Sequence, residues 1–176
     1  SEVAKEYRIP IAFHTSNTPA LTTTKGHPYL VQVVPNTTMD GRVLARMASE
    51  LGISDWAFIA PDYAFGRDLF AGFAPAFAEL SPSARVVSEQ WPKLGEADLI
   101  PFISALQANV PQGVAGNLWG DQLVTFIQQA ESLGLFEDAA YIGLFDLDFM
   151  KAIGADLPQG ELYGYARVPF YAVESE

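Results

Sequence analysis

The sequence predicts an α/β fold in which a doubly wound parallel sheet is covered by helices on both faces. Short apolar runs return about every 26 residues, helical patterns lie between most of them, and most runs end in a polar or aromatic loop. A strand followed by a helix needs roughly that length, and repeated units of this kind build a parallel sheet. The predicted strands are residues 9–13, 29–34, 56–60, 84–87, 113–118, 141–144 and 162–166.

The first elements suggest that the chain is a fragment. Residues 1–8 resemble the end of a helix whose beginning is missing, and a domain rarely opens in the middle of such a unit. The strand at 9–13 leads into a polar loop at 14–24, and the strand at 29–34 leads into residues 35–40.

Two long helices carry apolar stripes at helical spacing. The first stripe is Val43, Leu44, Met47, Ala48 and Leu51, and Gly52 follows it as the expected C-cap. The second stripe is Leu69, Phe70, Phe73, Phe77 and Leu80. Pro75 lies within the second stripe, where the missing N–H predicts a kink or an early break.

The C-terminal half continues the same alternation. One helix starts near Asp98 with Pro101 in its first turn, a second follows Asp121 and ends at Gly134, and a third spans residues 146–153. Four aspartates stand at or near predicted helix starts, where a carboxylate caps free N–H groups and favours the helix dipole. They are Asp40, Asp98, Asp121 and Asp146.

Composition excludes several classes of function. The 176 residues carry a formal net charge of −11 and no basic stripe, which argues against binding to nucleic acid or to an anionic membrane surface. Cysteine is absent, so disulfides, thiolate nucleophiles and cysteine-ligated metals are excluded. No stretch approaches the ~18 apolar residues that a membrane span needs.

No catalytic or cofactor motif stands out. The phosphate loop, the GxGxxG turn, HExxH and the GxSxG elbow are all missing. His14 and His27 lie on different loops and make no metal site, and Asp146 with Asp148 is better explained by a helix start than by a metal. We therefore expect no cofactor, no metal and no enzyme activity.

Loops at the carboxyl ends of the predicted strands are where a ligand would sit, because parallel strands bring these ends to one edge. The loop after the first strand offers hydroxyls, an amide and free N–H groups, which suit an anionic group such as a carboxylate. Aromatic residues follow later strands and offer large contact area in a cleft. The candidate site residues are Thr15, Ser16, Asn17, Tyr63, Phe65, Trp119, Phe145 and Asp146.

Several stretches, in the same order and spacing, resemble one family. They are residues 16–22 (SNTPALT), 61–68 (PDYAFGRD), 95–98 (GEAD), 129–130 (QA) and 152–160 (AIGADLPQG). They are similar to the type I periplasmic solute-binding proteins of ABC transporters, in the branched-chain amino acid (Leu/Ile/Val-binding) family. Members are roughly twice this long. The resemblance implies a remnant of the first lobe with the ligand loop at 1–28, a second lobe at 29–168 and a tail toward the hinge at 169–176.

The resemblance also implies a function. A Venus-flytrap protein in the periplasm would capture a small solute between its lobes and deliver it to an ABC permease in the membrane, without entering the membrane itself. Residues 15–17 would hold the ligand carboxylate and ammonium, with Phe65, Tyr63 and Trp119 lining the cleft. The acidic partner of the ammonium falls on Phe145, with Asp146 one step later. Either Asp146 takes that role, or the ligand is an aromatic or aliphatic acid without an amine.

Two other functions remain open from the sequence. A ligand-sensing receptor or regulator domain can share this fold, because fold does not settle function. An α/β enzyme is a third possibility and would need a nucleophile or an acid–base pair converging in the cleft. The identity of the ligand, the boundaries of the full-length protein and the oligomeric state are not determined by these residues.

Overall fold

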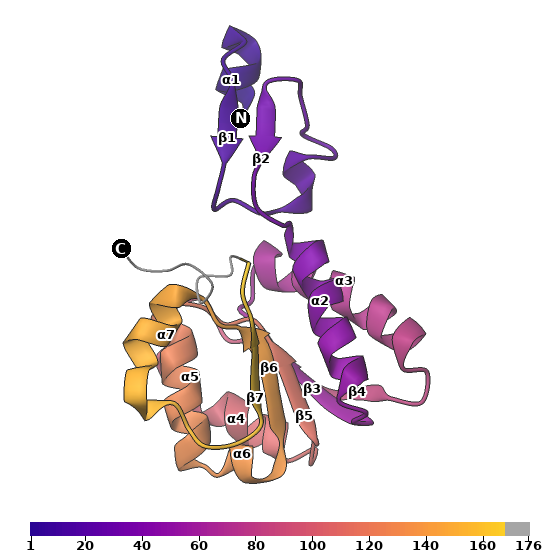
Figure 1. Cartoon of the computed structure of the whole chain (residues 1–176), viewed down its shortest axis with the longest axis vertical. Coiled ribbons are helices and arrows are strands. Elements are labelled where there is room, and N and C mark those ends of the chain that lie inside the picture. The colour runs from indigo at the N-terminus through magenta and orange to yellow at the C-terminus, as the bar shows by residue number, and fades with distance from the viewer. Residues whose placement is uncertain (168–176) are drawn as a thin grey trace, which may run out of the picture.

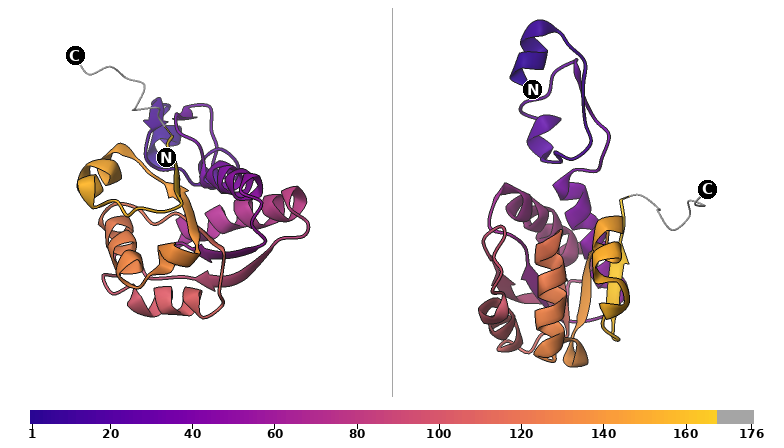
Figure 2. Two further views of the ribbon diagram at one scale, coloured as in Figure 1. Left: turned by 60° about the horizontal axis from the view of Figure 1, so that its bottom comes forward. Right: turned by 90° about the vertical axis from the view of Figure 1, so that its left-hand side faces the viewer.

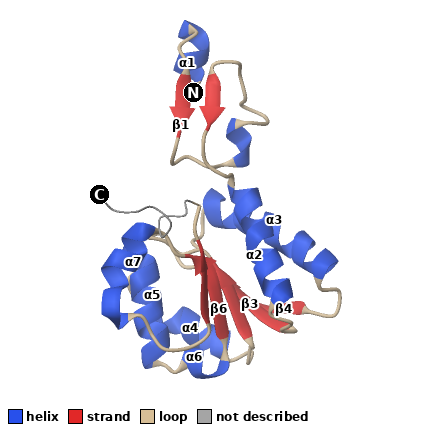
Figure 3. Cartoon of the chain, viewed as in Figure 1, coloured by secondary structure: helices blue, strands red, loops and turns tan. Residues whose placement is uncertain are grey.

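The computed structural model, which describes residues 1–167, contains two separate parallel sheets (Figure 1). A small sheet pairs β1 (Ile11–Phe13) with β2 (Leu30–Gln32), and a five-stranded sheet has the order β4-β3-β5-β6-β7. In both sheets the neighbouring strands run parallel. The predicted α/β fold with a parallel sheet is therefore confirmed, and Figure 3 shows its helices on both faces.

The elements alternate along the chain as the sequence period predicted. The strands of the larger sheet are β3 (Asp55–Ile59), β4 (Arg85–Gln90), β5 (Gly113–Gly116), β6 (Ala140–Leu144) and β7 (Leu162–Tyr165). The helices are α1 (Glu2–Tyr7), α2 (Thr37–Glu50), α3 (Ala64–Leu80), α4 (Ile100–Gln107), α5 (Asp121–Ser132), α6 (Leu135–Asp138) and α7 (Leu147–Ile153). Two 3₁₀ turns occur at Pro19–Leu21 and Gly154–Asp156.

The first 32 residues form a small unit apart from the larger sheet (Figure 2). Within it β1 and β2 pair in register, with Ala12 opposite Val31. The strand expected at 29–34 therefore belongs to the small sheet, and the change from one sheet to the other follows β2 instead of residue 28. The tail expected at 169–176 lies outside the described residues.

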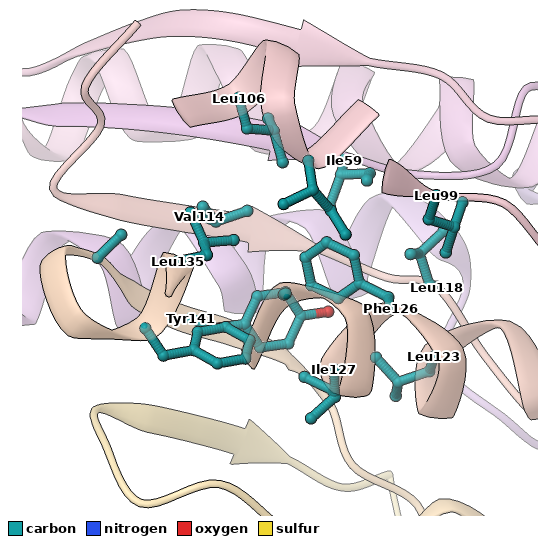
Figure 4. Packing of buried hydrophobic residues seen from close by; sticks show 14 of the residues in the cluster. Ile59, Leu99, Leu106, Val114, Leu118, Leu123, Phe126, Ile127, Leu135 and Tyr141 are labelled. Atoms are coloured by element: carbon teal, nitrogen blue, oxygen red, sulfur yellow. The ribbon is translucent and has the colours of Figure 1, made fainter. Parts of the chain in front are cut away.

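Two apolar cores lie on opposite faces of the larger sheet. Successive side chains of a strand point to opposite faces, so β3 contributes Trp56 and Phe58 to one core and Ala57 and Ile59 to the other. Helices α2 and α3 cover the first face, and α4, α5 and α7 cover the second. Figure 4 shows the second core, in which Phe126 of α5 lies between Ile59 and Tyr141. Both faces are buried, as a parallel sheet requires.

Helices α2 and α3 approach each other through glycine. A Cβ placed on Gly41 would lie 2.2 Å from the carbonyl oxygen of Leu69, and one on Gly72 would lie 2.6 Å from that of Thr38. Both distances are far below a van der Waals contact, so backbone packs on backbone at this crossing. Gly41 and Leu69 lie near the starts of α2 and α3, so this crossing brings the two helix starts close together, beside the site described below.

The break expected at Pro75 is absent, and α3 continues through this residue to Leu80. A helical proline leaves the carbonyl four residues earlier without a donor, which is costly when that carbonyl is buried. Here Ala71 and Pro75 are both on the exposed side of α3 or at its margin, so water can reach the freed carbonyl.

All four predicted capping aspartates lie at or near helix starts, but only two of them accept a hydrogen bond from an N–H group there. Asp146 is the N-cap of α7 and accepts from the Phe149 N–H at 2.8 Å, while Asp98 accepts from the Ile100 N–H at 3.2 Å at the start of α4. Asp121 lies in the first turn of α5, where its charge favours the helix dipole. Asp40 lies in the first turn of α2 as predicted, but the capping role is wrong, because Asn36 caps this helix and Asp40 is buried.

Candidate functional site

A depression of about 270 Å³ lies between the small unit and the starts of α2 and α3. It is found at the carboxyl edge of the larger sheet, the edge that faces the small unit in Figure 1. Its lining comes from a loop of the small unit and from the first residues of both helices. These residues are Thr15, Ser16, Asn17, Thr18, Thr37, Tyr63, Ala64 and Phe65.

The loop of the small unit is fixed to both sides of the depression. The Asn17 carbonyl accepts from the Thr37 N–H of α2 at 2.9 Å, and the Thr18 hydroxyl donates to Asp68 of α3 at 3.3 Å. Within the small unit, the side-chain amide of Gln32 donates to the Ser16 carbonyl at 3.4 Å. The loop is therefore in contact with the starts of both helices in this structure.

Three aromatic residues form a wall beside this loop. The rings of Tyr63 and Phe65 stack with centroids 5.8 Å apart, and the Trp119 indole N–H donates to the Tyr63 hydroxyl at 3.2 Å. Tyr63 is 37% exposed and Trp119 is 44% exposed. Large aromatic surfaces held in place but open to solvent are typical of a ligand cleft.

The turn that carries Tyr63 is held from behind by Arg67. Its guanidinium donates to Asp62 with Nε 3.0 Å from Oδ1, and its central carbon lies 3.8 Å from the centre of the Trp91 ring. An ion pair and a cation–π contact on one planar group restrict how the turn can move. The aromatic wall is in this way fixed to α3 and to the end of β4.

The depression favours a neutral or negatively charged group. None of its lining residues carries a charge, and two helices of 14 and 17 residues begin at it. At α2 the N–H groups of Thr37 and Met39 are already bonded to Asn17 and Asn36, whereas no side chain caps α3. Free N–H groups at a helix start carry a partial positive charge that attracts an anion, so α3 supplies this attraction. Among the described residues, no group of three His, Asp or Glu side chains is placed to hold a metal ion.

Of the predicted site residues, the structure brings six together. Thr15, Ser16, Asn17, Tyr63 and Phe65 line the depression, and Trp119 lies outside this lining but donates a hydrogen bond to Tyr63.

The structure does not bring Phe145 and Asp146 to this depression. Phe145 is 8% exposed and lies in the core, with its ring centroid 4.8 Å from that of Phe149 and 6.1 Å from that of Tyr141. The Asp146 carboxylate is engaged as the cap of α7. The direction of both side chains is set by how the chain turns from β6 into α7.

Thr37 is a lining residue that the sequence interpretation did not single out. Its side chain is fully buried, and its hydroxyl has no hydrogen-bond partner among the residues that the structure describes. Asn36, Thr37 and Thr38 follow a strand and precede an apolar stripe, which is the pattern of a helix start. That pattern is the signal that could have placed Thr37 at the site.

The capping role of Asp146 gives a testable expectation. Replacing Asp146 by alanine should lower the free energy of unfolding by about 1 kcal/mol, the usual effect of losing a helix cap, while Asp146→Asn should cost little. Urea unfolding followed by circular dichroism measures both. Asp148→Ala is the matched control, since Asp148 is exposed in the first turn of the same helix. Equal losses from Asp146→Ala and Asp148→Ala would contradict the capping role.

Comparison with known proteins places these features in context. A sequence profile of the family described as periplasmic binding protein matches residues 1–174. No curated protein sequence matches the chain significantly. No helix within residues 1–167 combines the length and apolar character needed to cross a membrane.

Solved structures share the fold at low sequence identity. An amino acid ABC transporter substrate-binding protein from Pseudomonas fluorescens superposes with a TM-score of 0.85 at 17% identity, covering 99% of this chain and 46% of the other. A solute-binding protein from R. palustris, solved with benzoate, has a TM-score of 0.80 at 17% identity and 88% and 42% coverage. A leucine-, isoleucine-, valine-, threonine- and alanine-binding protein from Brucella ovis has a TM-score of 0.76 at 20% identity, with the same coverage. The chain thus spans less than half the length of these structures.

Proposed function

Because the chain belongs to the periplasmic binding protein family, we propose that it forms part of the extracytoplasmic solute-binding component of an ABC importer. The family is one of binding proteins without enzyme activity. In this proposal the partners are a small solute and an ABC permease, and the location is the periplasm. The observation that carries the proposal is the uncharged depression at two helix starts beside the aromatic wall.

We assign the small unit, residues 1–32, to one lobe and residues 37–167 to the other. The two parts have separate sheets, and the related structures are more than twice as long as this chain. The small unit also exposes apolar side chains that a complete lobe would cover. Val3 and Tyr7 are each 67% exposed, and Val31 is 57% exposed.

The proposed solute is a small organic acid with an apolar or aromatic body and no amine. Its carboxylate would be held by Ser16, Asn17 and the start of α3, and its body would pack on Tyr63, Phe65 and Trp119. An ammonium in the same place would find no carboxylate among the described residues that line the depression. Similar structures were solved with benzoate and with 4-hydroxybenzoate, which are acids of this kind.

Matched pairs of ligands test this assignment most directly. The pair 3-phenylpropanoate and L-phenylalanine, and the pair 4-methylpentanoate and L-leucine, differ only in the amine. Burying an ammonium without a partner costs several kcal/mol, so the acid of each pair should bind at least about tenfold more tightly. Isothermal titration calorimetry on a protein carrying both lobes measures the difference.

Tyr63 supplies the control variants for that titration. Tyr63→Ala should weaken binding of 3-phenylpropanoate, while Tyr63→Phe, which keeps the ring, should bind it nearly as tightly as the parent. Tighter binding of L-leucine than of 4-methylpentanoate would overturn the amine-free assignment. Failure of all four compounds to bind would count against the proposed site itself.

A further inference from the structure

A buried ion pair lies at the same edge of the larger sheet, outside the depression. Asp40, in the first turn of α2, is 2% exposed, and the side chain of Arg167, which follows β7, is 22% exposed. Arg167 donates through Nη2 to Oδ2 of Asp40 and through Nε to Oδ1 at 3.4 Å. The guanidinium therefore meets both carboxylate oxygens.

The pair adjoins a chain of buried polar groups along the strand ends. The fully buried Asn117, just after β5, donates to the Tyr165 hydroxyl at 3.2 Å and accepts from the Leu144 N–H at 3.0 Å. Burial raises the pKa of the Tyr165 phenol, and the nearby negative charge of Asp40 raises it further. The ends of β5, β6 and β7 are thus connected to the first turn of α2.

Stability alone does not explain this arrangement. Burial raises the pKa of the Asp40 carboxyl above its ordinary value even though Arg167 lowers it, so the loss of hydration outweighs the attraction. Buried ion pairs of this kind are often no more stable than apolar replacements, and the best-attested reason to keep one is that it specifies a single geometry.

The location of the pair indicates which geometry is specified. Residues 33–36 connect the small unit to α2, and Asp40 lies one turn further on. Arg167 lies where the described chain leaves β7, 127 residues later. The first turn of α2 also touches the small unit directly, through the hydrogen bond from Thr37 to Asn17.

We propose that Asp40 and Arg167 are positioning residues of a hinge, which tie the segment after β7 to the first turn of α2. The two segments then move as one body with the larger sheet, and the small unit turns relative to them only about residues 33–36. The inference rests on the two-lobed arrangement proposed above, but not on the identity of the solute.

A second ion pair provides a matched control. Arg85 of β4 meets Asp55 of β3 in the same two-pronged way, at 2.8 Å and 3.3 Å. Both residues lie at the starts of their strands, the end of the sheet away from the small unit. Breaking this pair removes an arginine–aspartate contact from the larger sheet without touching the proposed hinge.

The orientation of the small unit can be measured directly. The chain has no cysteine, so Lys25→Cys in the small unit and Glu131→Cys in α5 can carry a single pair of spin labels. Both positions are exposed. Double electron–electron resonance then gives the distribution of distances between the labels, without any solute. Arg167→Met should widen this distribution at least about twofold, while Arg85→Met should leave it as in the parent.

Other variants keep the test decisive. Asp40→Asn retains the shape of the side chain but not its charge, and it should widen the distribution even if Arg167→Met fails to fold. Arg167→Lys keeps the positive charge but loses the planar guanidinium that meets both carboxylate oxygens, so it should give an intermediate width. A parental distribution in folded Arg167→Met or Asp40→Asn would overturn the hinge role, as would equal widening by Arg85→Met. Because no solute is used, either outcome is independent of the ligand titrations.

Discussion

Replacing Gly41 by alanine is expected to destabilise the protein by about 2–3 kcal/mol or more, because the added methyl group overpacks a helix crossing. The new Cβ would lie 2.2 Å from the Leu69 carbonyl oxygen and 2.7 Å from the Phe73 nitrogen. Both are backbone atoms of α3, which cannot rotate away as a side chain would. The same change at an exposed helical site would stabilise by up to about 1 kcal/mol, so the expected effect has the opposite sign.

Urea unfolding followed by circular dichroism measures the free energy of the Gly41→Ala variant. Arg42→Ala is the control, since Arg42 is the next residue of α2 and is exposed. Surface changes of this kind usually stay within about 0.5 kcal/mol. A Gly41→Ala variant as stable as the parent would show that α2 and α3 do not touch through their backbones.

Breaking the Asp40–Arg167 pair is the second change with a large expected effect. Arg167→Met leaves a buried carboxylate without its partner, and such a loss costs about 3–5 kcal/mol. Asp40→Asn should cost less, because Arg167 is partly exposed and can turn toward water. The double variant carries neither charge, so it should be more stable than Arg167→Met alone.

A double-mutant cycle of chemical denaturation curves gives these values. The coupling free energy should be large. Adding Asp40→Asn to Arg167→Met should restore part of the stability that Arg167→Met alone loses. Additive losses, with the double variant less stable than either single variant, would contradict a direct interaction between the two side chains.

The fold could be predicted from local patterns because each strand and helix carries its own signal. The apolar runs marked the strands of both sheets, and the stripes at Leu44 and Phe73 marked the helices that cover one face. These patterns do not show which strands pair with one another. The strand at 29–34 pairs with β1 instead of joining the larger sheet, and no local feature of its sequence determines that pairing.

The same limit applies to single residues. Asp40 has the neighbours of a capping residue, but it is buried and pairs with Arg167, which is distant in sequence. Pro75 has the local effect of a helix breaker, and its tolerance depends on which side of α3 faces water. In both cases the outcome is decided by the environment that the rest of the chain builds.

The candidate site shows where strand order is sufficient and where it is not. The loops after β3 and β5 could be placed at one edge because parallel strands of one sheet share their direction, and Trp119 of the second loop bonds to Tyr63 of the first. The loop after β1 also lines the depression, but it comes from the other sheet, so strand order within one sheet does not account for its position. Phe145 and Asp146 follow β6 by the same rule. Their side chains nevertheless pack inward or cap α7, since the path of the chain after a strand is not set by strand order.

The strand order also bears on how the protein assembles as it is synthesised. In the order β4-β3-β5-β6-β7, β3 is made first, β4 adds to one of its edges, and β5, β6 and β7 then extend the other edge in turn. In this order each later strand lies at an outer edge of those before it, so no strand has to insert between two strands that are already paired. Arg167 follows the last of these strands, so its contact with Asp40 joins the strand that is synthesised last to the helix that precedes β3.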